Sequence, residues 1–130
     1  MDPGRARRIA IADDSPTFVD AAASYIAALP GYALAGTVHA TANALTLVTS
    51  SAPDVLLLGL GPAPARGLDL LRRVKALPSA PAVVAMTLFH SPEAAAAAIG
   101  AGAVGLVGKD GFVPGLTQLL ARLFPAQIAA

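Results

Sequence analysis

The stretch Arg8-Ile9-Ala10-Ile11-Ala12-Asp13-Asp14 is a short apolar run that ends abruptly in two acids. An apolar run of this length, bounded by charge, is typical of a buried strand. Four further runs follow at residues 32–38, 54–60, 81–87 and 103–107. Helical patterns lie between the runs, and such alternation is typical of a parallel sheet covered on both faces. The sequence therefore predicts an α/β fold with five strand–helix units in three layers.

Apolar residues at helical spacing mark three of the helices. Their predicted buried faces are Phe18, Ala22, Tyr25, Ile26 and Leu29, then Leu70, Leu71, Val74 and Leu77, and finally Phe112, Leu116, Leu119, Leu120 and Leu123. Ser15-Pro16 supplies a capping hydroxyl before a proline at the first helical position, and Pro30-Gly31 predicts the end of that helix. Residues 92–101 form the weakest helix, because Ile99 is its only sizeable apolar anchor. We expect that helix to be mobile or packed on a partner.

Composition bounds the class of protein. The chain has 130 residues and a formal net charge of +1, which predicts one domain over residues 1–130 and argues against nucleic-acid or membrane binding. Cysteine is absent, which excludes thiol catalysis and Cys-based zinc sites. The uncharged residues 21–53 are broken by Pro30-Gly31, and the N-terminal pattern does not fit a signal peptide. We therefore expect a soluble, cytoplasmic protein.

Charge is scarce, since charged residues make up 13% of the chain and hydrophobic residues 55%. An average soluble domain carries about twice that share of charge. Some apolar surface must therefore be exposed, and such surface is often covered by a partner.

Polar residues should converge at one edge of the predicted sheet. The carboxyl ends of the first, third, fourth and fifth strands would bring together Asp13, Asp14, Gly59, Thr87 and Lys109. Adjacent acids can bind Mg²⁺, while a lysine and a threonine hydroxyl can contact phosphoryl oxygens. Residues 61–67, a proline-stiffened loop, would border this edge.

Each of these residues also has a purely structural interpretation. Asp13 and Asp14 could favour the dipole of the helix that begins at Ser15-Pro16. Lys109 should form an ion pair with one of these acids, and Thr87 should bond locally.

Other polar residues carry less functional signal. His39 and His90 lack a second ligand at metal-binding spacing. Arg72, Arg73 and Lys75 are expected on a solvated helix face.

The segments together resemble the receiver domain of two-component response regulators. The resemblance rests on residues 8–14, 53–58 and 83–87, and on the glycine-rich segment 100–110 that contains Lys109. It covers the whole chain and implies a flavodoxin-like, doubly wound sheet with strand order 2-1-3-4-5. The sequence around Lys109 is most similar to receivers that precede a helix-turn-helix DNA-binding domain, and no such domain follows within residues 1–130.

Two departures from the family pattern concern the switch itself. Gly59 stands where the family has the aspartate that accepts a phosphoryl group, so we expect no phospho-acceptor. Leu106 stands where the family usually has an aromatic switch residue, and Thr87 and Lys109 occupy the other switch positions. Asp13 and Asp14 alone would bind Mg²⁺ weakly, and Gly59→Asp should strengthen that binding.

The sequence thus favours an atypical, phosphorylation-independent receiver that is not an enzyme and requires no cofactor. By resemblance, its protein partner or second copy would contact the fourth helix, the fifth strand and the final helix. The alternative is a receiver-like domain switched by a cation or small ligand at the acidic pocket. A flavin carrier is a third class, but the acids at residues 13 and 14 would repel a flavin phosphate.

Overall fold

Five parallel strands form the sheet in the computed structural model, which describes residues 5–125. The strands are β1 (Arg7–Ala12), β2 (Tyr32–Val38), β3 (Val55–Gly59), β4 (Ala82–Thr87) and β5 (Gly105–Gly108). They lie in the order β2-β1-β3-β4-β5. The predicted doubly wound, flavodoxin-like fold is confirmed.

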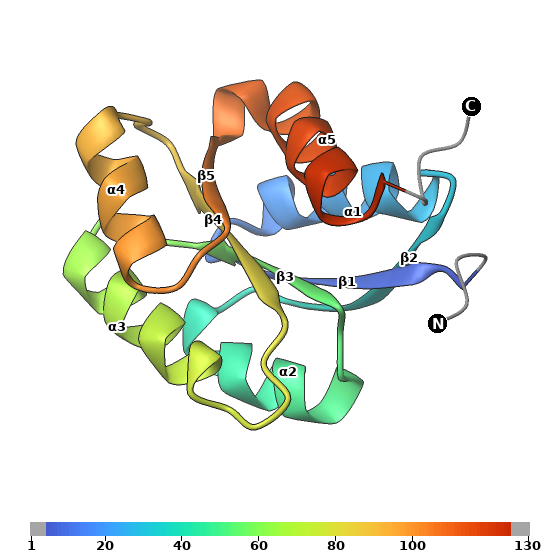
Figure 1. The fold of residues 1–130 in the computed structure, drawn as a ribbon, viewed down its shortest axis with the longest axis horizontal. Helices are drawn as coiled ribbons and strands as arrows, with labels where there is room; N and C mark the ends of the chain where they lie inside the picture. The colour runs from blue at the N-terminus through green and yellow to red at the C-terminus, as the bar shows by residue number, and fades with distance from the viewer. Residues whose placement is uncertain (1–4, 126–130) are drawn as a thin grey trace.

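Five helices cover the two faces of this sheet (Figure 1). They are α1 (Pro16–Ala27), α2 (Ala44–Ser51), α3 (Pro64–Lys75), α4 (Pro92–Gly100) and α5 (Phe112–Leu123). Helices α1 and α5 lie on one face, and α2, α3 and α4 lie on the other. Among residues 5–125, no helix is long and apolar enough to cross a membrane.

The alternation of side chains along β1 builds both cores. Ile9 and Ile11 pack with the apolar residues of α1 and α5. Ala10 and Ala12 point to the other face and pack with α2, α3 and α4. β3 is buried along its whole length, which explains why its sequence is continuously apolar.

The helix ends follow the expected capping chemistry only in part. The Ser15 side chain accepts a hydrogen bond from the Phe18 amide at 3.3 Å, as predicted for the start of α1.

The prediction of a loop over residues 61–67 is wrong in its second half, because α3 begins at Pro64. A Cβ atom at Gly67 would lie 2.6 Å from the Leu60 carbonyl oxygen, so this close approach of helix and loop requires glycine.

Helix α2 was not located from the sequence. Its eight residues include four threonines or serines, and only Ala44, Leu47 and Val48 are buried. It follows a short 3-10 turn at Thr41–Asn43. A short helix with so few apolar positions gives a weak periodic signal.

Two predictions about side-chain placement are wrong. Ile99 does not anchor α4, since it is 55% exposed, and the fully buried Ala98 takes that role. Lys75 does not lie on a solvated face, because its Nζ donates to the Pro81 carbonyl oxygen at 2.8 Å. Arg72 and Arg73 are exposed, as expected.

Asp54 ties β1 to β3 at the amino edge of the sheet, opposite the predicted site. Its carboxylate accepts a hydrogen bond from the Arg8 amide at 2.8 Å and pairs with the Arg5 guanidinium at 3.1 Å. Burial alone would raise the pKa of Asp54, but the bonds from Arg5 and Arg8 and the nearby positive charge hold that pKa below its usual value.

We expect Asp54→Asn to lower the free energy of unfolding by about 1 kcal/mol at neutral pH. Because the pKa is depressed in the folded state, the stabilisation is present above the unfolded pKa and is lost as the pH falls through the folded value. The difference between the two proteins should therefore shrink below about pH 4. Urea unfolding across this range tests it, with the exposed Asp69→Asn as the matched control. A difference that does not change with pH would contradict this account.

Candidate functional site

A buried ion pair occupies the carboxyl edge of the sheet. Asp13 follows β1 and is 2% exposed, and Lys109 follows β5. The Lys109 Nζ lies 2.8 Å from each of the two Asp13 carboxylate oxygens, which confirms the predicted pairing. Asp13 Oδ1 also accepts the Ser15 amide at 2.9 Å, and the Lys109 ammonium lies 4.7 Å from the centre of the Phe18 ring. The lysine charge is thus matched on one side by a carboxylate and on the other by an aromatic face.

Gly59 lies at the end of β3, directly against this ion pair. A Cβ atom built on Gly59 would lie 2.0 Å from Asp13 Oδ2 and 2.8 Å from Asp13 Cγ. The three atoms nearest to that position all belong to Asp13. The carboxylate of Asp13 therefore takes the space that a side chain at residue 59 would need.

The remaining predicted residues are held apart from the ion pair. Asp14 is exposed, and its Oδ1 accepts the Thr41 amide at 2.8 Å, so the structure separates the two neighbouring acids. The Thr87 hydroxyl oxygen accepts the Phe89 amide of its own loop at 3.2 Å, as the local interpretation predicted. Leu106 is 9% exposed and belongs to the core on the α4 side of the sheet.

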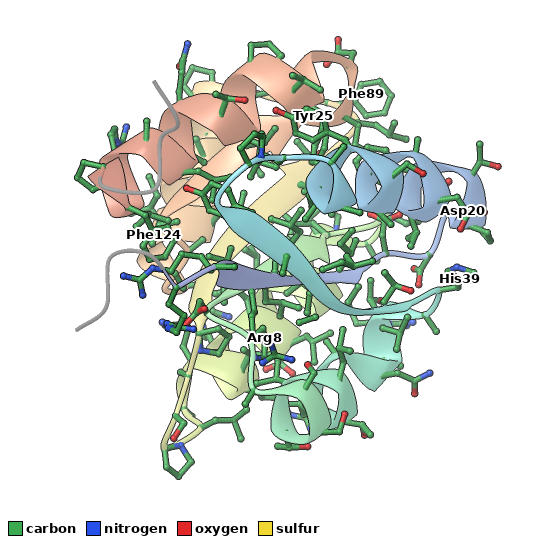
Figure 2. All side chains as sticks on the ribbon, turned by 90° about the vertical axis from the view of Figure 1, so that its right-hand side faces the viewer. Arg8, Asp20, Tyr25, His39, Phe89 and Phe124 are labelled. Atoms are coloured by element: carbon green, nitrogen blue, oxygen red, sulfur yellow. The ribbon has the colours of Figure 1, made fainter. Side chains whose placement is uncertain are left out.

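A pocket of about 340 Å³ opens beside Asp13 and Lys109. Its walls include Pro62, Met86, Leu88 and Phe89 as well as Thr87. Leu88 and Phe89 are 66% and 84% exposed, and Phe89 lies at the periphery of the molecule (Figure 2). These two residues were missed from the sequence. The sequence did offer a signal: the apolar run of β4 continues past its end with Leu88 and Phe89.

Residues 9–121 match the response regulator receiver domain. The chain belongs to this family. No curated protein matches the chain.

Solved receivers share the fold. The receiver of a DNA-binding response regulator from Colwellia psychrerythraea 34H is 24% identical, with a TM-score of 0.78 over 90% of this chain and 97% of that one. A LuxR-family two-component response regulator from Aurantimonas sp. SI85-9A1 is 25% identical, with a TM-score of 0.80 over 96% and 89%. The receiver of NarL from Mycobacterium tuberculosis is 23% identical, with a TM-score of 0.78 over 96% and 99%.

The residues of this receiver do not fit a Mg²⁺ ion well. Mg²⁺ requires near-octahedral oxygen ligands. Asp13 is bound to Lys109, Gly59 contributes no carboxylate, and Asp14 Oδ1 is turned to the Thr41 amide. Within residues 5–125, no group of three His, Cys, Asp or Glu side chains is placed to hold a metal ion.

The histidines of the receiver stand outside this pocket. His39 does have a carboxylate close by, contrary to the sequence analysis, since its Nε2 lies 3.8 Å from Asp20 Oδ1 (Figure 2). The two residues come from different elements, so their separation in the sequence concealed the contact. A single exposed carboxylate and one imidazole make a surface pair that contributes little to stability.

We expect Gly59→Ala to lower the free energy of unfolding by about 2 kcal/mol, because the new methyl group must push Asp13 away from Lys109. The control is Gly100→Ala, where a Cβ atom meets nothing within 4 Å. Denaturant unfolding measures both. In an Asp13→Ala background, Gly59→Ala should cost little, since the two contacts under 3.0 Å are with the Asp13 Oδ2 and Cγ atoms that this substitution removes. An equal cost in both backgrounds would contradict this assignment.

Proposed function

We propose that this receiver acts without phosphorylation, as a signalling module that works through protein contacts and catalyses no reaction. The observation that carries the proposal is the placement of the Asp13 carboxylate in the space beside Gly59. The family resemblance puts the phospho-acceptor aspartate at residue 59, and glycine offers no nucleophile there. Asp13, the nearest carboxylate, is buried and bound to Lys109, so it is a poor replacement.

The other parts of the switch support the same proposal. Lys109, which would neutralise phosphoryl oxygens, is already engaged by Asp13. Thr87 accepts a hydrogen bond within its own loop, and Leu106 carries no ring that could swing between two positions. Without a phosphoryl group to change the contacts of these residues, the domain keeps one stable arrangement. No Mg²⁺ is required to maintain it.

We place the contact surface on α4, β5 and α5. Helix α4 contains five consecutive alanines and one charged residue, Glu93, and its Ile99 is 55% exposed. Val113 at the start of α5 is 44% exposed. Covering these side chains would be favourable by about 25 cal/mol for each Å² of apolar surface removed from water. The occupant is a cytoplasmic protein or a second copy of the chain, with no direct contact to nucleic acid or membrane.

Amide NMR with Mg²⁺ and beryllofluoride tests the loss of phosphorylation. Beryllofluoride mimics a phosphoryl group and needs an acceptor carboxylate, so we expect no shifts near residues 13, 59, 87 and 109. Gly59→Asp restores that carboxylate and, once Asp13 has rotated away, should restore Mg²⁺ binding and a response to beryllofluoride. Saturable shifts in the unsubstituted protein would refute the proposal. A Gly59→Asp protein that binds Mg²⁺ no better would show that residue 59 does not face Asp13.

Sedimentation velocity tests the contact surface. If the chain self-associates, Ile99→Asp should weaken the association at least about tenfold, because a charge would be buried in an apolar contact. Leu34→Asp, at a partly exposed position on the outer strand β2, is the control and should leave association unchanged. Association that is equally sensitive to both changes would place the contact elsewhere.

A further inference from the structure

The pocket beside the ion pair has lost the charge that a phosphate site requires. The positive charge of Lys109 is matched by Asp13, whose two oxygens both lie 2.8 Å from Nζ. Asp14 turns one oxygen to the Thr41 amide, and Ser15 uses its hydroxyl oxygen to cap α1. An anion entering this pocket would find no unmatched cation.

The rest of the pocket is apolar. Pro62 comes from the loop before α3, Met86 from β4, and Leu88 and Phe89 from the loop after β4. Met86 is fully buried, whereas Leu88 and Phe89 are largely exposed. Exposed large apolar side chains grouped at a concave surface are typical of a binding site.

One polar group in the pocket keeps an unused donor. The Thr87 hydroxyl oxygen accepts the Phe89 amide at 3.2 Å, and the hydroxyl donates none of the hydrogen bonds found within residues 5–125. A hydroxyl can donate one hydrogen bond while it accepts another. This donor lies among the apolar walls, so a ligand held there would be oriented by a single hydrogen bond.

We propose that this pocket binds an uncharged, mainly apolar small molecule that carries one hydrogen-bond acceptor, which receives the Thr87 hydroxyl proton. The volume of about 340 Å³ lies at the lower end of the range for small-molecule sites. The inference rests on the proposed absence of phosphorylation at residue 59, because a phosphoryl group would compete for the same space. It does not depend on the contact surface of α4, β5 and α5.

The neutral fluorophore 6-propionyl-2-dimethylaminonaphthalene is a suitable probe, because it is apolar and has one ketone acceptor. Titration of the full chain should give saturable, blue-shifted emission with one site per chain. Thr87→Val should weaken binding about threefold to tenfold, and Thr87→Ser, which keeps the hydroxyl, should restore it. Phe89→Asp should weaken it further. Leu34→Asp, on β2 and outside both the pocket and the proposed contact surface, is the control and should bind as the unsubstituted protein does.

The outcomes separate the two proposals. Absence of saturable binding, or equal binding by Thr87→Val, Phe89→Asp and the unsubstituted protein, would overturn the pocket assignment while leaving the proposed function intact. Probe displacement by beryllofluoride with Mg²⁺ in the unsubstituted protein would overturn both, since it would show that the pocket still accepts a phosphoryl mimic. Saturable binding that follows the predicted order of variants and is insensitive to beryllofluoride supports both.

Discussion

The ion pair between Asp13 and Lys109 is the constraint on which the carboxyl edge of this receiver depends. A carboxylate that is 2% exposed is costly unless a cation and further hydrogen bonds satisfy it. Lys109 and the Ser15 amide supply these partners, and the geometry leaves no room for a Cβ atom on Gly59. The absence of a side chain at residue 59 and the position of the Asp13 carboxylate therefore depend on each other.

The ion pair limits what the edge of the sheet can do. In a phosphate-binding site, cationic side chains have no anionic partner until the ligand binds, and binding changes their positions. Here Asp13 and Lys109 neutralise each other before any ligand arrives, and the Phe18 ring lies against the ammonium. The parallel sheet still gathers polar residues at this edge, but their hydrogen bonds and charges serve the fold. Fold alone does not imply function, so the chemistry of this edge has to be argued from its own residues.

Much of this could be predicted from the sequence because the signals were local. Strand runs such as residues 8–13, the Ser15-Pro16 cap and the Asp13–Lys109 pairing follow from patterning, capping and the convergence of strand ends. The short helix α2 gave too few apolar positions, and Ile99 was misplaced because the buried contacts of α4 are made by alanines such as Ala98. The position of Asp13 over Gly59 needed coordinates, since no sequence pattern specifies which way a carboxylate turns.

The apolar character of the pocket has the same origin as the loss of charge. Leu88 and Phe89 follow Thr87 directly, where they would raise the cost of bringing a solvated, doubly charged phosphoryl group to the site. Such neighbours conflict with phosphate chemistry but are compatible with a neutral ion pair at the pocket floor. The apolar side chains after β4 and the matched charges of Asp13 and Lys109 therefore both make an added charge in this pocket unfavourable. The proposal of an uncharged ligand rests on this agreement between the apolar walls and the matched charges.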